Sequence, residues 1–173
     1  MACALTSNRA KIACKDILGG NSIIYLFDNI ADPFTVSAAN VATEINAGIT
    51  TVFAYPLMGD ANTLEQSMVG DSASYTRVNT QTLTIQLPKM SVADSAEFNL
   101  LAASFAHAVV KDRAGNYMAL GITDGMDWTV VGATGGAKTD ANGWTITATA
   151  TEGKLSPFLD ASAVANLLGL KLP

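Results

Sequence analysis

The stretch that decides the fold is Trp144–Thr151, which reads WTITATAT. Apolar residues and threonines alternate along it, so one face of the segment can be buried while the other carries a row of hydroxyl groups. A period of two is typical of a β-strand with one buried face. The segment therefore predicts a half-buried strand in an antiparallel sheet.

A second long strand is predicted within Ser74–Leu87. Leucine and isoleucine alternate with threonine and glutamine from Thr82 to Leu87, and the stretch is long enough to reach beyond a single small sheet. It therefore suits one strand of an extended hairpin. Shorter strands are predicted at Ile23–Phe27, Thr50–Leu57, Ala108–Lys111, Tyr117–Leu120 and Trp128–Val131.

One principal helix is predicted at about residues 92–106. Ser91 is followed three residues later by Asp94, as in a capping box with the shorter acid. Phe98, Leu101 and Phe105 then recur at helical spacing. The helix should therefore present one apolar face to a sheet.

Three further segments complete the prediction. After the helix, His107–Asp112 and Tyr117–Gly121 flank the turn sequence RAGN and predict a hairpin. Near the end of the chain, Asp160 is a suitable N-cap for a short helix over Ala161–Leu168, which Gly169 would follow. The region Ala38–Gly48 is compatible with either a helical turn or a strand.

These patterns predict a mainly β fold of the β-rich α+β class. We expect an antiparallel β-sandwich or barrel with one main flanking helix and a short C-terminal helix. The length suits one domain. Residues 1–159 would form the β-domain, and residues 160–173 would form a docking tail.

Composition and net charge argue against several classes of protein. The chain has 173 residues, and only 14% of them are charged, against about 25% in an ordinary globular domain. The hydrophobic fraction of 49% supplies a packed core and excludes disorder. The net charge of -5 argues against a basic surface that clamps nucleic acid. The longest apolar run, Leu100–Val110, is too short to span a membrane, and no secretory signal is evident.

Gly132–Thr139, GATGGAKT, nearly matches a phosphate-binding P-loop. Ala137 stands where the motif needs a glycine, and the segment is followed by Asp140–Gly143 and a strand, where the motif needs a helix. The segment therefore predicts a Gly-rich hairpin loop. A small nucleotide-dependent enzyme stays open as a third hypothesis on this motif alone.

Other candidate chemical groups are given structural interpretations. His107, the single histidine, suits a packing role more than catalysis. Cys3 and Cys14 suit small buried thiols more than a disulfide or a metal site. Trp128 and Trp144 suit the core. Turns, not a calcium site, are predicted around Asp112, Asp124, Asp127 and Asp140. We therefore expect no catalytic, cofactor-binding or metal-binding residues.

Most of residues 2–159 resembles virion structural proteins of tailed bacteriophages, of the tail-tube-like kind. The residues that carry the resemblance are Ala10–Asp16, Ser74–Leu87, Leu100-Leu101, Val109–Tyr117, Leu120-Gly121, Asn142–Thr147 and Ser156–Phe158. Residues after Asp160 have no counterpart in it. The resemblance implies a non-enzymatic subunit, made in the host cytoplasm, of a tail tube or tail ring in the virion.

The resemblance further implies a homo-oligomeric ring of six subunits, or of twelve beside a portal, in contact with other tail or portal-proximal proteins. A long hairpin would join neighbours into one continuous barrel, and DNA would pass through its lumen without specific binding. We expect the inter-subunit strands at Tyr75–Leu87 and Thr50–Leu57. The residues assigned to assembly are Thr51, Phe53, Tyr55, Tyr75, Val78, Leu83, Thr84 and Ile85.

Two consequences separate the hypotheses. A proline at Thr84 is expected to block assembly more than folding, because it removes a ladder donor. The alternative, a surface adhesin or pilus-like β-domain, would also explain threonine-rich strands, but it requires export.

Overall fold

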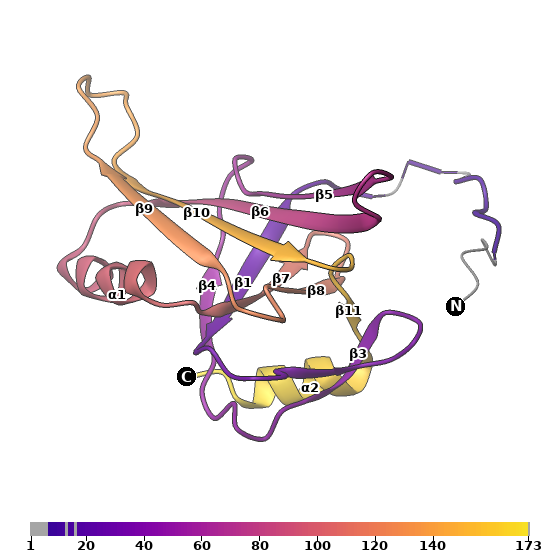
Figure 1. The fold of residues 1–173 in the computed structure, drawn as a ribbon. Coiled ribbons are helices and arrows are strands. Elements are labelled where there is room, and N and C mark those ends of the chain that lie inside the picture. The colour runs from indigo at the N-terminus through magenta and orange to yellow at the C-terminus, as the bar shows by residue number, and fades with distance from the viewer. Residues whose placement is uncertain (1–6, 13, 16, 173) are drawn as a thin grey trace.

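A computed structural model of the chain describes residues 7–12, 14–15 and 17–172, and its fold is mainly β (Figure 1). The elements follow one another as β1 (Asn21–Phe27), β2 (Phe34–Val36), β3 (Val41–Ile45), β4 (Phe53–Pro56), β5 (Thr63–Asp71), β6 (Thr76–Pro88), α1 (Val92–Ala103), β7 (His107–Asp112), β8 (Tyr117–Leu120), β9 (Asp127–Ala133), β10 (Gly143–Glu152), β11 (Phe158–Leu159) and α2 (Ala161–Gly169). The region from residue 38 to 48, which the sequence leaves open, contains strand β3.

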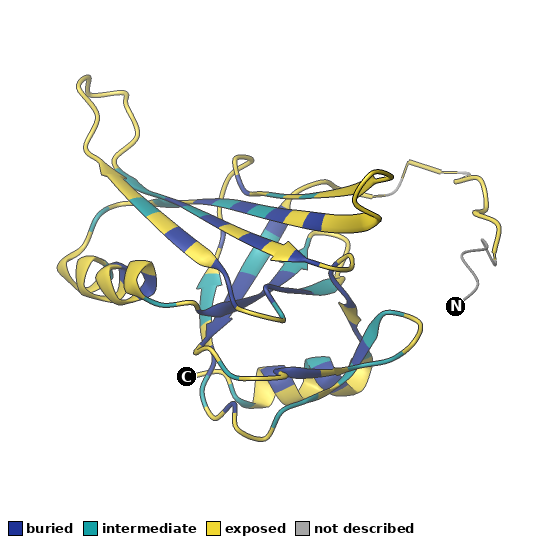
Figure 2. Cartoon of the chain, viewed as in Figure 1, coloured by how far each residue is buried: buried dark blue, intermediate teal, exposed yellow. Residues whose placement is uncertain are grey.

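The threonine-rich strands form one four-stranded antiparallel sheet in the order β5-β6-β10-β9. β10 contains the Trp144–Thr151 stretch and pairs with β6 from Gly143 opposite Pro88 to Glu152 opposite Asn79. Buried and exposed residues alternate along both strands (Figure 2). The alternation predicted from the sequence is therefore confirmed.

The remaining strands form a seven-stranded sheet in the order β2-β3-β11-β8-β7-β1-β4. β11 runs parallel to β3, and the other pairings are antiparallel. Side chains of β1 are buried on both faces of this sheet, which explains why its sequence, NSIIYLF, is apolar without alternation.

The two faces of the seven-stranded sheet support two cores. The first lies between the sheets and under α1, and it includes Ile24, Leu83, Phe98, Val110 and Ile146. The second lies on the other face, where α2 covers it, and it includes Phe27, Val52, Val109, Leu159 and Leu167. The fold is thus two open sheets with helices on separate faces. It is not a closed barrel, which corrects that part of the expectation, because each sheet has two edge strands.

Helix α1 is shorter than predicted. It begins as expected, with the Ser91 hydroxyl accepting a hydrogen bond from the Asp94 N–H at 3.1 Å. It ends at Ala103, because both the N–H and the hydroxyl of Ser104 donate to the Leu101 carbonyl. Phe105 therefore lies outside the helix and is exposed.

Residues 160–172 pack on their own chain. Asp160 caps α2 as predicted, accepting from the Ala163 N–H at 2.8 Å, and Ala163 and Leu167 are buried. Gly169 is the last helical residue, not the residue after the helix. The chain then pairs with Val52, which bonds to Leu170 and Leu172. Neither helix of the described chain has the length and apolarity needed to cross a membrane.

Candidate functional site

The residues assigned to assembly lie in two different sheets, and the structure does not bring them together. Leu83, Thr84 and Ile85 belong to β6, which pairs with β5 on one side and β10 on the other. Leu83 and Ile85 are buried in the core, and Thr84 is on the outer face. Strand β6 is therefore paired on both sides from Asn79 to Thr84, and an inter-subunit role for its residues stays a prediction.

The other predicted assembly strand, β4, is an edge strand that is already partly covered. Thr51 precedes it, and Phe53 and Tyr55 lie in it. Val52 donates to the Leu170 carbonyl and accepts from the Leu172 N–H, both at 3.0 Å. The backbone N–H and C=O groups of every second residue point to the same side of a strand. The backbone groups of Ala54 and Pro56 therefore also point away from β1, and Pro56 has no N–H to donate. Little of this edge is left for another strand.

The β5–β6 hairpin extends past the sheet. Thr76–Val78 pair with β5 but not with β10, and Tyr75 lies in the turn with φ of 55° instead of in the strand. The Asp71 carboxylate holds this turn, because it accepts from the Ser74 hydroxyl and the Ala73 N–H. These bonds lower the pKa of Asp71. Tyr75, at 94% exposure, is thus presented at the tip.

The two outer strands of the four-stranded sheet, β5 and β9, have no strand paired on their outer sides, although α1 packs against β9. Lys89 N–H donates to the Asn142 carbonyl across β6 and β10, and Gln86 N–H donates to Asn62 on the β5 side. Backbone groups of successive residues point to opposite sides of a strand. Counted from these two bonds, the N–H groups of every second residue of β5 and β9 therefore point away from the sheet. The residues with outward N–H groups are Leu64, Gln66, Met68 and Gly70 in β5, and Trp128, Val130 and Gly132 in β9.

The outer face of this sheet, here called the threonine face, is uncharged over most of its area. Thr63, Thr84, Thr147 and Thr129 stand opposite one another and form a row across all four strands. The next row contains Glu65, Thr82, Thr149 and Asp127. Asp127 is therefore the first residue of a strand, not a turn residue as predicted. Hydroxyl groups dominate the face, and its two charged members in these rows are acidic.

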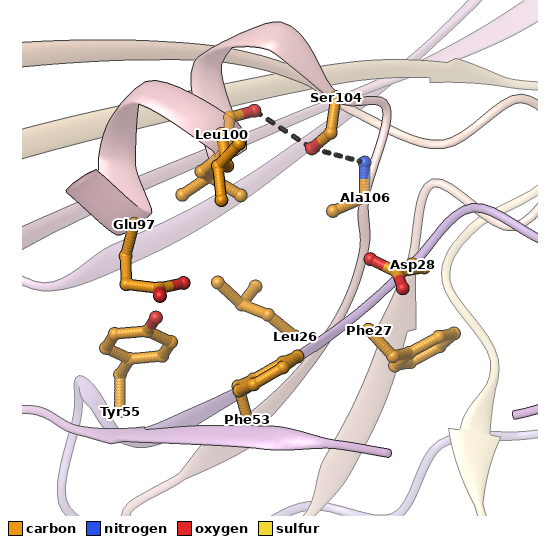
Figure 3. Close-up of a pocket in the computed structure, with 10 residues that line it drawn as sticks. Leu26, Phe27, Asp28, Phe53, Tyr55, Glu97, Leu100, Ser104 and Ala106 are labelled. Atoms are coloured by element: carbon orange, nitrogen blue, oxygen red, sulfur yellow. Dashed lines mark hydrogen bonds between the residues drawn. The ribbon is translucent and has the colours of Figure 1, made fainter. Parts of the chain in front are cut away.

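A groove lies between α1 and the ends of β1 and β4, and we call it the α1–β4 groove (Figure 3). It encloses about 190 Å³. Leu26, Phe53 and Leu100 supply its apolar surface, and Asp28 and Glu97 bring carboxylates to its lining. Burial raises the pKa of Tyr55, and the negative charges of Glu97 and Asp94 raise it further. The groove is therefore apolar and electrostatically negative.

The P-loop-like segment is the loop that joins β9 to β10, as predicted. Its residues are exposed, and the Asp140 carboxylate accepts hydrogen bonds from the Gly136 and Ala137 N–H groups, each at 2.8 Å. These bonds lower the pKa of Asp140. Two of the backbone donors that a phosphate would need are thus bonded to a carboxylate within the loop.

His107 is buried and fully engaged. Its Nδ1 lies 2.5 Å from the Gly121 carbonyl oxygen, and its Nε2 lies 3.1 Å from the N and O of Ile30. Its ring also packs against Phe27. The packing role predicted for this histidine is confirmed.

The structure confirms the core position predicted for the two tryptophans and corrects the burial predicted for Cys14. Trp128 is buried and donates to the Ala106 carbonyl at 3.0 Å, and Trp144 packs edge-on against Phe98, so both tryptophans belong to the core. Cys14 is exposed, which corrects its interpretation as a buried thiol, and Cys3 lies outside the described residues. Among the described residues, no cluster of His, Cys, Asp and Glu could hold a metal ion.

Sequence reasoning missed two features. The α1–β4 groove depends on a helix and a strand that are more than 30 residues apart, so no local pattern could find it. The exposed segment before β1 had a signal, because its basic and aliphatic residues are interspersed without the period of a helix or strand.

Comparison of the chain with protein-family models, curated proteins and solved structures finds no match.

Proposed function

We propose that the chain is a structural subunit of a phage tail tube or tail ring that assembles around a DNA-conducting channel. One observation carries the proposal, namely the threonine face with an open strand at each side. An edge strand with unpaired N–H and C=O groups is a template for pairing with another chain. Strand β5 of one subunit would pair with β9 of the next.

Such a contact is heterologous, because it joins two different surfaces. Repeated about a rotation axis it closes into a ring, and stacked rings give a tube. Six subunits, or twelve beside a portal, is the number that the resemblance implies. The virion tail would be the site of the assembled protein, with other tail or portal-proximal proteins as its neighbours.

The threonine face would line the channel. Lysine and arginine bind DNA by releasing counterions from its phosphates, and the two main rows of this face carry Glu65 and Asp127 instead. A wall of hydroxyl groups with a few carboxylates would let the genome pass without holding it. No catalytic step or cofactor is part of this function.

The test is the assembly state of the purified full-length protein, measured by mass photometry and negative-stain electron microscopy. Met68→Pro removes an outward N–H from edge strand β5, where proline is tolerated, while Met68→Leu keeps it. We expect rings from the unchanged protein and from Met68→Leu, and folded monomers from Met68→Pro.

A strictly monomeric protein at high concentration, with no rings in virions, would overturn the proposal. Recovery of the native protein outside cells without virions would favour the adhesin alternative, which the threonine-rich strands also suit.

A further inference from the structure

The segment that precedes β1 is exposed along its described length. Residues 7–12, 14–15 and 17–19, here called the N-terminal segment, lie in neither a helix nor a strand and run away from the body of the fold (Figures 1 and 2). Ile12, Ile17 and Leu18 nevertheless expose most of their surface. Three exposed aliphatic side chains within seven residues offer apolar surface to a partner.

The segment is basic and the body is acidic. Residues 1–19 hold three basic side chains, Arg9, Lys11 and Lys15, against one acidic one, Asp16, whereas residues 20–173 hold seven basic side chains against fourteen acidic ones. The salt bridge found among the described residues is Arg113–Asp60, which lies in the body. The basic side chains of the segment therefore have their charge complement on the body of the protein.

The α1–β4 groove has the matching chemistry. Leu100, at 67% exposure, and Phe53 offer apolar contact to aliphatic side chains, while Asp28 and Glu97 offer carboxylates to lysine or arginine (Figure 3). The groove can therefore receive a segment in which aliphatic and basic residues are interspersed, as Lys11-Ile12 and Lys15 with Ile17 are.

The groove and the segment are at opposite ends of β1. The segment enters β1 at Asn21, whereas Leu26 and Asp28 at the far end line the groove, about 20 Å along the strand. Ile17 and Leu18 lie only four and three residues before Asn21, which span at most about 14 Å, so they cannot reach the groove of their own chain. The segment leaves the body on the side away from α1 (Figure 1). The occupant is accordingly a second copy of the chain.

We propose that the N-terminal segment of one copy docks in the α1–β4 groove of another copy, with Ile12, Ile17 or Leu18 on Leu100 and Phe53, and with Lys11 or Lys15 facing Asp28 and Glu97. The contact is heterologous, so it can continue from copy to copy. It rests on the proposed self-assembly of the chain and adds a second, strand-independent contact to it.

The native thiol of Cys14 provides the test, because it lies in the segment and is free and exposed. In full-length protein carrying Cys3→Ser, the groove variant Leu100→Cys is oxidised under mild conditions and its products are separated without reductant. The matched control is Ser162→Cys, an exposed residue of helix α2. We expect at least about tenfold more disulfide-linked dimers and larger multimers from Leu100→Cys, since docking raises the local thiol concentration.

Charge reversal tests the partner groups. Glu97→Lys in the Leu100→Cys background should lower the cross-linking yield, and Lys11→Glu with Lys15→Glu should restore it. Cys14→Ser should abolish the multimers larger than dimers, because each chain then carries a single thiol. Equal yields from Leu100→Cys and Ser162→Cys, or a product confined to single chains, would overturn the inference.

Electron microscopy of the same samples separates this inference from the proposed function. Rings without groove cross-links would refute the docking of the segment and leave the tail assignment standing. Cross-linked multimers without rings would support the docking of the segment and refute the tail assignment.

Discussion

Gly125 shows how closely the chain is packed at single residues. Its φ is 84°, its N–H donates to the Gly121 carbonyl at 3.0 Å, and a Cβ placed on it would collide with the carbonyl oxygen of Phe105. Gly125→Ala should therefore lower the free energy of unfolding by more than about 2 kcal/mol.

The matched control is Gly153→Ala, because a Cβ at Gly153 meets nothing within 4 Å. Its effect should stay within about 0.5 kcal/mol. Urea denaturation of both variants measures the difference, and equal stabilities would contradict the packing described at Gly125.

Ionisation of the buried Tyr25 should lower the stability of the fold at alkaline pH. Burial raises the pKa of Tyr25 to about 12 from 10.0, and the neighbouring Tyr117 adds to the effect. The folded protein therefore holds this proton more tightly than the unfolded chain. The resulting stabilisation is complete below pH 10 and is lost as the pH rises toward 12.

Replacement of the phenol by Tyr25→Phe removes that titration. As the pH rises from 10 to 12, the unchanged protein loses this stabilisation and the variant has none to lose. The decrease in the free energy of unfolding over that range should therefore be smaller for the variant, by on the order of 1–2 kcal/mol. Urea denaturation across this range measures the difference. Parallel curves for the two proteins would contradict it.

At the scale of elements, the position of β6 changes the outcome expected for Thr84→Pro. The sequence led us to expect that proline at this position would block assembly more than folding. Thr84 instead lies in an interior strand, opposite Thr63 of β5 and Thr147 of β10, and alternation directs its N–H to β5. Proline removes this ladder hydrogen bond and leaves its acceptor in β5 without a partner, which should cost about 1–3 kcal/mol and loosen β5.

Thr84→Val is the control, because it keeps the N–H and suits a strand. Circular dichroism and urea denaturation should show lost stability for Thr84→Pro alone. A folded Thr84→Pro monomer with normal stability would show that β5 does not depend on this bond.

Helix α2 offers a paired test of the second core. Leu167 is completely buried, whereas its neighbour Leu168 is 43% exposed. Leu167→Ala should cost about 2–5 kcal/mol, because the cavity it leaves lies between α2 and the seven-stranded sheet. Leu168→Ala should cost much less. If thermal unfolding showed equal losses, the docking of α2 on its own chain would be wrong.

At the scale of the whole molecule, the charge balance predicts behaviour toward DNA. The chain carries a net charge of -5, and three of its ten basic residues lie in the N-terminal segment. Binding of duplex DNA at physiological salt depends on basic patches, so the protein should leave the mobility of linear DNA unchanged in a gel-shift assay. A salt-sensitive shift would contradict a channel that does not hold the genome.

Much of the local structure could be predicted from the sequence. The alternation in Trp144–Thr151 identified β10, and the Asp160 signal located the start of α2. The sequence also indicated the hairpin formed by β7 and β8. Each of these depends on residues that are close together in the chain, where side-chain period and capping are set by backbone geometry alone. The end of α1 was missed because the Ser104 bonds to Leu101, not the apolar spacing of Phe105, decide it.

The sequence by itself therefore determined the strand-rich character of the protein, its hydroxyl-lined strands and its low, acidic charge. Only the tertiary structure decided which strands share a sheet, that β5 and β9 are the open edges, and that α1 and β4 form a groove. The physical reason is that strand order and grooves arise from contacts between residues far apart in the chain. A local pattern records which face of a strand is buried, but not which neighbour covers it.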